Sequence, residues 1–171
     1  MAAGVRANIS LSIDATLTGS NDLGNPKQRV LIEKALSFIA GTAADDEANI
    51  LFSDTRTLAA SATEDLDLAG VLANAFGATI TAAEIVAIFF SAADGNTNSV
   101  NVTRPAANGF IGPFLAAGDG VAIKPGEWQF FASDSGWAVT AATGDLLTVT
   151  NSAAGTSVTY DVLILGRTVA A

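Results

Sequence analysis

The side chains that could do chemistry in this chain are carboxylates, amides, hydroxyls, a few lysines and one tyrosine. Its 171 residues include no histidine and no cysteine, which excludes Ser-His-Asp and Cys-His nucleophiles and the zinc sites built on those residues. Three acids in one predicted strand, Glu64, Asp65 and Asp67, are the remaining candidates for glycoside hydrolysis or for binding a divalent cation. A solvated strand face explains the same run, and we favour it because runs of charge are usually solvated. We therefore predict neither an enzyme nor a cofactor.

A second candidate begins at Asp94. The segment Asp94-Gly95-Asn96-Thr97-Asn98 places side-chain oxygens at alternate positions, as the start of a calcium-binding loop does. The glycine expected after Asn98 is missing, and Pro105 stands at the twelfth position, where the loop needs a glutamate. A plain turn is the better interpretation, so no metal site is predicted.

A third candidate is a set of aromatic residues near the C-terminal third of the chain. Aromatic rings can stack on sugar rings, so these residues could line a carbohydrate-binding face, although core or interface packing is the more common role. The set consists of Trp128, Phe130, Phe131, Trp137 and Tyr160.

Charge and hydropathy exclude other partners. The formal net charge is −9, with only eight lysines and arginines, and none of these residues cluster as nucleic-acid binding requires. No apolar stretch approaches the roughly 20 residues of a membrane-spanning helix. No basic-then-apolar leader opens the sequence. We therefore expect no nucleic acid and no membrane as partners, and a soluble chain that is not secreted by a cleaved signal.

The elements that carry these residues have the alternation of β-strands. Residues 144–166 form two runs rich in Thr and β-branched residues around a turn at 151–155, which predicts a β-hairpin. In its second run, Val158, Tyr160, Val162 and Ile164 share one face. Leu163 and Leu165 make the other face apolar as well, so both faces of this strand must be covered.

The N-terminal segment alternates most regularly. Apolar residues at every second position from 5 to 17 predict a long strand with one wet face. Typical strand lengths favour an ordinary sandwich strand, and an arm that reaches a neighbouring subunit is the alternative. Residues 27–40 fit either a helix that begins after Asn25-Pro26 or a strand, and local rules do not decide between them.

Further strands are predicted with turn residues between them, which indicates one domain over residues 1–171, with an N-terminal strand or arm at 1–24 and a main body at 25–171. The predicted fold class is all-β: an antiparallel β-sandwich, jelly-roll-like, with an extended N-terminal strand or arm. The other predicted strands cover 50–60, 63–72, 78–92, 99–103, 120–123, 128–132 and 137–140.

Three segments resemble small structural proteins encoded in tailed-bacteriophage and prophage genomes. They are LFSDTRTLAASATEDLDLAG at 51–70, AFGATITAAEIVAIFFSAADGNTNSVNV at 75–102 and GDLLTVTNSAAGTSVTYDVLILG at 144–166. The resemblance implies a virion component with an all-β fold, assembled as a symmetric oligomer on a particle surface. It also favours a strand over residues 30–40, and it identifies no functional residues.

The sequence therefore predicts a capsid cement or decoration protein on the outside of a tailed-phage head, made in the host cytoplasm. We expect a homo-oligomer, with a trimer favoured, that binds the major capsid protein through buried area and strand addition. Alternatives are a tail, baseplate or head-fibre component and a carbohydrate-binding sandwich. The candidate interface residues are Val5, Ile9, Leu11, Ile13, Phe89, Phe90, Val162, Ile164 and Leu165.

Overall fold

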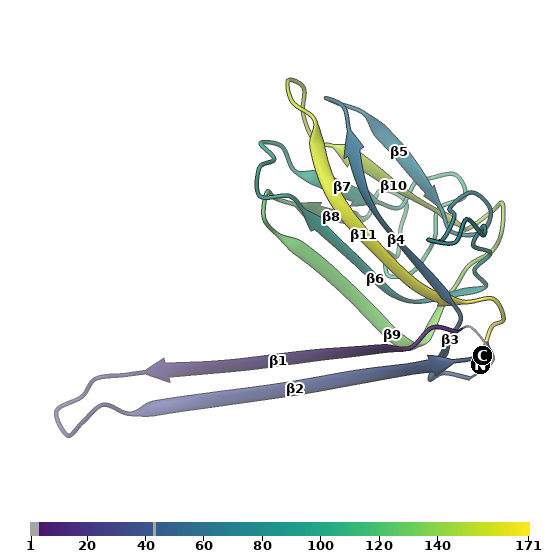
Figure 1. The fold of residues 1–171 in the computed structure, drawn as a ribbon. Helices are drawn as coiled ribbons and strands as arrows, with labels where there is room; N and C mark the ends of the chain where they lie inside the picture. The colour runs from purple at the N-terminus through teal and green to yellow at the C-terminus, as the bar shows by residue number, and fades with distance from the viewer. Residues whose placement is uncertain (1–3, 43) are drawn as a thin grey trace.

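The computed structural model describes residues 4–42 and 44–171 and contains eleven strands and no helix in this part of the chain. A sandwich of two sheets forms the body, and a long two-stranded ribbon extends from one end of it (Figure 1). The strands are β1 (Ala7–Thr18), β2 (Lys27–Ala40), β3 (Glu47–Ala48), β4 (Ile50–Leu58), β5 (Thr63–Asp67), β6 (Glu84–Ala92), β7 (Val100–Thr103), β8 (Gly120–Ile123), β9 (Trp128–Ala138), β10 (Leu146–Asn151) and β11 (Val158–Arg167).

The sandwich confirms the predicted all-β, antiparallel class. One sheet has the order β4-β11-β6-β9 and the other the order β5-β10-β7-β8. Their facing sides enclose the main core, which includes Phe52, Leu66, Phe90, Val102 and Ile164. Alternation along each strand sends these apolar side chains inward and Thr, Ser and Asp outward, as expected for two packed sheets.

The eight strands of the sandwich pair in a nested order. The first pairs with the last (β4 with β11), the second with the seventh (β5 with β10), the third with the sixth (β6 with β9) and the fourth with the fifth (β7 with β8), all antiparallel. The chain therefore folds back on itself like one long ribbon that is wrapped into two sheets.

The predicted hairpin at 144–166 is wrong. Its two strands, β10 and β11, lie in different sheets, and each is paired on both sides with other strands. The turn between them crosses from one sheet to the other, and the buried Asn151 side chain donates to the carbonyls of Ala59 and Thr156 at 2.9 and 2.8 Å. Because both strands point an apolar face into the same core, the alternation predicted the strands correctly but not their partners.

Other boundaries differ from the sequence prediction, among them the end of β5, which lies at Asp67 and not at residue 72. Strand β6 begins at Glu84 and not at residue 78, and the separate strands expected at 128–132 and 137–140 are one strand, β9. The register of β9 against β6 shifts between Ile85 and Ala87, and Gly136 has a φ of +74° there. This irregularity bends β9 where the ribbon joins the sandwich.

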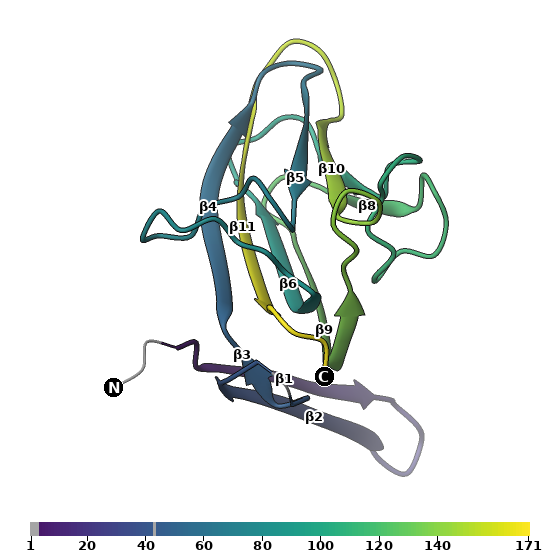
Figure 2. The same cartoon turned by 90° about the vertical axis from the view of Figure 1, so that its right-hand side faces the viewer.

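Strands β1 and β2 form the ribbon, here called the arm (residues 7–40). They pair over twelve consecutive positions, from Ala7 with Phe38 to Thr18 with Lys27, so residues 27–40 are strand and belong to the arm rather than to the body. The first three residues of the predicted N-terminal segment lie outside the described residues. Figure 2 shows the arm crossing beneath the end of the sandwich.

The arm is amphipathic, because cross-strand partners in an antiparallel pair point to the same face. Its apolar face carries Ala7, Ile9, Leu11, Ile13, Ala15 and Leu17 from β1, and Phe38, Leu36, Lys34, Ile32, Val30 and Gln28 from β2. On its polar face, side-chain bonds connect the two strands, including the ion pair between Arg29 and Asp14 at 2.7 Å.

The root of the arm is held to the body by the buried guanidinium of Arg167. Its Nε lies 2.6 Å from Glu84 Oε2 in β6, one Nη donates to the carbonyl of Ala44 beyond the arm, and the other donates to the carbonyl of Asp134 in β9. The side chain of Arg167 has no exposed surface. Three segments far apart in the sequence therefore meet on one charged group.

We expect Arg167→Ala to lower the free energy of unfolding by about 3–5 kcal/mol, because it leaves Glu84 buried without its cation and removes the hydrogen bonds to the carbonyls of Ala44 and Asp134. Chemical denaturation of the full chain measures this loss. Arg29→Ala is the control, since the exposed Arg29–Asp14 pair on the arm should not change the denaturation midpoint measurably. Equal midpoints for Arg167→Ala and the unmodified chain would contradict the role given to Arg167.

Candidate interaction surface

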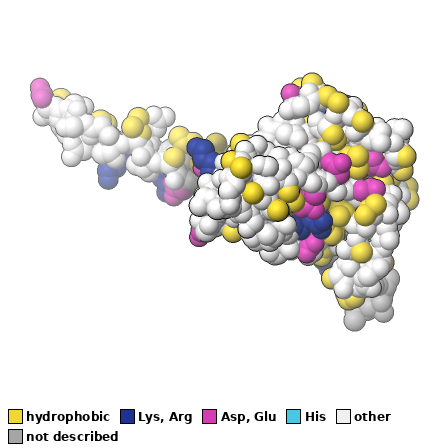
Figure 3. All heavy atoms as spheres, turned by 90° about the horizontal axis from the view of Figure 1, so that it is seen from above, with side chains coloured by type: hydrophobic (Ala, Val, Ile, Leu, Met, Phe, Trp, Pro, Cys, Tyr) yellow, Lys and Arg dark blue, Asp and Glu magenta, His cyan; other side chains and the backbone are white. Residues whose placement is uncertain are grey.

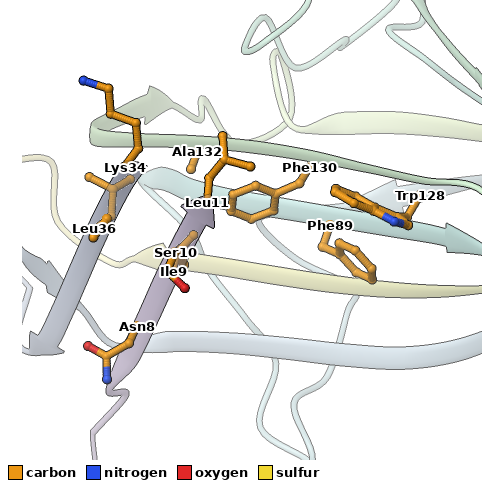
Figure 4. Close-up of a pocket in the computed structure, with 11 residues that line it drawn as sticks. Asn8, Ile9, Ser10, Leu11, Lys34, Leu36, Phe89, Trp128, Phe130 and Ala132 are labelled. Carbon is orange, nitrogen blue, oxygen red and sulfur yellow. The ribbon is translucent and has the colours of Figure 1, made fainter. Parts of the chain in front are cut away.

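An apolar groove lies between the arm and the sandwich. Its volume is about 800 Å³. One wall is the root half of the arm, and the other is the outer face of the sheet β4-β11-β6-β9, here meaning the side away from the other sheet (Figure 4). The lining residues are Asn8, Ile9, Ser10, Leu11, Lys34, Ala35, Leu36, Phe89, Trp128, Phe130 and Ala132.

The sandwich wall of the groove consists of aromatic residues on two neighbouring strands. Phe89 of β6 pairs in register with Phe130 of β9, and its ring lies 6.2 Å from that of Trp128 at an interplanar angle of 32°. Trp128 is 58% exposed although it is a large ring on a sheet face. An exposed aromatic pair of this kind is typical of a contact surface rather than of a solvated strand.

The arm wall is covered only near the root. Phe38, Ala48, Val86, Ala87 and Leu165 form a second buried cluster, against which Val5, Ala7, Ile9 and Leu36 pack. Beyond this cluster the apolar face of the arm is open: Leu11 is 48% exposed, Ile13 45%, Val30 42% and Ile32 44%. Figure 3 shows hydrophobic side chains recurring along the arm as it leaves the body.

The nine predicted interface residues divide into two groups. Ile9, Leu11 and Phe89 line the groove, Ile13 continues the open arm face, and Val5 packs at the root. The others, Phe90, Val162, Ile164 and Leu165, are at most 4% exposed within one chain, so no partner can reach them. The sequence indicated correctly that both faces of β11 are covered. The sandwich core covers one face and the root of the arm covers much of the other, so a partner chain is not needed for either.

The groove residues that the sequence analysis did not single out are Asn8, Ser10, Lys34, Ala35, Leu36 and Ala132. Leu36 and Lys34 were missed because residues 27–40 fitted a helix as well as a strand. The signal was present in the alternation of Val30, Ile32 and Leu36, which matches the alternation of residues 5–17 pair by pair once the two segments are placed antiparallel.

The three candidate carboxylates are not brought together into a catalytic site. Asp65 accepts from the hydroxyl of Thr148, and Asp67 accepts from the backbone N–H of Ala69. Glu64 points instead toward the sandwich core, where it accepts a hydrogen bond from Arg56 Nε and another from the Tyr160 hydroxyl, both at 2.8 Å. Each acid therefore serves a structural contact. No group of three potential metal ligands occurs among the described residues.

The side chains of the calcium-like segment serve as a clamp between strands. The Asn96 side chain both donates to the carbonyl and accepts from the N–H of Thr159 at 2.8 Å. Asn98 donates to Asn151 Oδ1 at 2.9 Å. These bonds tie the connection after β6 to the end of β10 and the start of β11, so the Asn96 amide and the Asn98 amide nitrogen are used inside the chain.

The aromatic candidates do not form one platform. Trp128 and Phe130 lie on the outer face, whereas Phe131 and Trp137 pack against the core and Tyr160 is 1% exposed inside it. Phe131 meets Phe114 edge-to-face at 5.8 Å. A sugar-binding face could use Trp128 and Phe130 of this set, with Phe89 beside them.

Comparison with known proteins gives no match: no family model, no curated protein and no solved structure is significantly similar to this chain. The resemblance to phage structural proteins therefore stays a prediction. Within residues 4–42 and 44–171, no helix is long and apolar enough to cross a membrane.

The Glu64 contact predicts a pH dependence. Burial, followed by the hydrogen bond to Glu64, raises the pKa of the Tyr160 hydroxyl well above its ordinary value. The folded chain therefore keeps this hydroxyl protonated at a pH where the unfolded chain loses the proton, above about pH 10. The contribution of the protonated Tyr160 hydroxyl to the free energy of unfolding is fully present below that pH, and it falls as the pH rises further.

Denaturation at pH 8 to 11 tests this expectation, and Tyr160→Phe should remove the part of the alkaline loss that this residue causes. Tyr160 is the only tyrosine, so phenolate absorbance reports on it alone and should appear together with unfolding. Phenolate absorbance in a chain that is still folded near pH 10 would contradict the assignment.

Proposed function

We propose that this protein is a structural subunit of a virion, a decoration protein on the outer surface of a tailed-phage head. It works as a homo-oligomer, with a trimer as the proposed order, and it stabilises the lattice of the major capsid protein by burying surface and not by catalysis. The observation that carries the proposal is the long arm, whose apolar face extends beyond its own body.

The nested strand pairing supports this proposal. We interpret the order β4-β11-β6-β9 against β5-β10-β7-β8 as a jelly roll, in which an eight-stranded ribbon is wrapped into two sheets. Jelly rolls are common in viral capsid domains and lectin domains. Since a fold does not define a function, the argument for assembly depends on the arm and not on the sandwich alone.

An isolated two-stranded ribbon is at best marginally stable in water, and an exposed apolar ribbon tends to associate with other chains. A partner that covers the arm would remove both problems. The free edge of β1, which pairs with β2 alone among the described strands, also offers main-chain groups for strand addition to a neighbour.

The charge distribution is consistent with a surface position on a particle. A formal charge of −9 opposes adhesion to packaged DNA and to anionic cell envelopes, while leaving an apolar contact free to form. Nothing in this argument requires an enzyme, a cofactor or a metal.

Particles produced with and without the gene for this chain test the proposal. We expect the protein in purified heads, and we expect heads that lack it to release DNA at lower temperature or after milder osmotic shock. Particles that lack the protein and are equally resistant would contradict the stabilising role. Density for the protein on the tail, the baseplate or a head fibre in a particle reconstruction would favour the alternative position in the virion.

A further inference from the structure

We propose that the distal half of the arm docks on the outer face of the sheet β4-β11-β6-β9 of a second copy of the same chain. The inference rests on the proposed role in assembly and identifies the partner of the arm. The docking segment is Ile13 to Leu17 of β1 with the facing residues of β2, and the acceptor is the exposed surface around Phe89, Trp128 and Leu163.

The arm supplies an apolar surface that its own body cannot cover. Val30 pairs with Ala15, four residues beyond Leu11 along β1, which places it about 13 Å further from the root at roughly 3.3 Å per residue. Leu11 lines the groove, but Ile13 and Val30 do not. The groove therefore ends where the distal half begins, and the distal residues stay exposed.

The acceptor supplies a surface of the same character. The root half of the arm and the outer-face residues Leu163, Phe130 and Ala132 pack against one shared buried cluster. Further from the root the same face continues with Phe89 and Trp128. These two residues line the groove beside the arm of the same chain, but the arm does not cover them. Docking of a second arm would extend a contact that already exists within each chain.

Charge makes a second copy a suitable occupant. The arm holds three basic and three acidic residues and is formally neutral, so the full charge of −9 lies on the rest of the chain. The docking half itself, residues 13–18 with 27–32, holds Lys27, Arg29 and Asp14 and has a formal charge of +1. Asp161 lies exposed on the acceptor face, in a shallow depression next to Phe89 and Leu163. The two surfaces therefore carry opposite charges.

The size of the surfaces favours reciprocal docking. Six residue pairs of a two-stranded ribbon span a flat area of only roughly 200 Å², calculated from the strand spacing and the rise per residue. A stable interface buries about 800 Å² on each partner. If each of two copies docks its arm on the other copy, the buried area doubles. The two sandwich bodies also come into contact. This closure requires donor and acceptor surfaces on the same chain, as found here.

Two variants of β1 with equal added charge test the docking. Ile13→Glu with Leu17→Glu places two carboxylates on the apolar face of the docking half, while Ser12→Glu with Thr16→Glu places two on the polar face of the same strand at the same spacing. Sedimentation of the full chain should show a dissociation constant raised at least about tenfold for the first variant, as for loss of a hot-spot contact. The second variant should associate like the unmodified chain. Equal association of both variants would overturn the proposal.

Photo-crosslinking identifies the acceptor. A photoreactive amino acid at Val30 in the unlabelled chain is mixed with an isotope-labelled chain that lacks it, so that mass spectrometry separates crosslinks between copies from those within one copy. Adducts on β6, β9 or β11 of the labelled chain support the proposal. Adducts confined to the other arm, or to the same chain, overturn it.

Particle binding separates this proposal from the proposed function. If the unmodified chain is monomeric in solution but binds phage heads, with its arm crosslinked to the major capsid protein, docking between copies is overturned and the decoration role stands. If copies crosslink as expected but the protein is absent from particles, docking is supported and the decoration role fails.

Discussion

The position of the arm depends on one buried charge. Arg167 ends β11 and donates to Glu84, to the carbonyl of Ala44 and to the carbonyl of Asp134, so the last strand, the segment after the arm and the bent strand β9 meet at a single guanidinium. A charge without exposed surface is stable only when its donors are satisfied. These contacts hold the segment after the arm against β6 and β9, beside the buried cluster in which Phe38 holds the root of the arm itself.

The sequence predicts the elements better than their partners. Apolar residues at every second position from 5 to 17 predict β1 correctly, and the ambiguity at 27–40 is resolved only by pairing. A helix there would leave the apolar face of β1 without a neighbour, whereas a strand continues that face over twelve positions. Local capping signals such as Asn25-Pro26 favour the helix at short range, but the long-range pairing outweighs them.

The prediction of a hairpin at 144–166 is wrong for the same reason. Two alternating runs around a short turn look identical to local rules whether the strands pair with each other or lie in opposite sheets. What separates the cases is the number of neighbours available: β10 lies between β5 and β7, and β11 lies between β4 and β6. The buried side chain of Asn151 then satisfies carbonyls where the chain crosses between sheets. None of these relations is visible within 23 consecutive residues.

The contacts of the polar side chains are consistent with the proposed role in assembly. Glu64 is held by Arg56 and Tyr160, Asn96 by Thr159, and Glu84 by Arg167, so the groups that could have done chemistry stabilise the sandwich instead. The apolar side chains show the opposite imbalance, since Ile13, Val30 and Trp128 stay exposed after the core is complete. A chain that satisfies its polar groups internally and leaves an ordered apolar ribbon in solvent gains free energy mainly by burying that ribbon. Surface burial between chains is therefore the activity that we propose for this arrangement of residues.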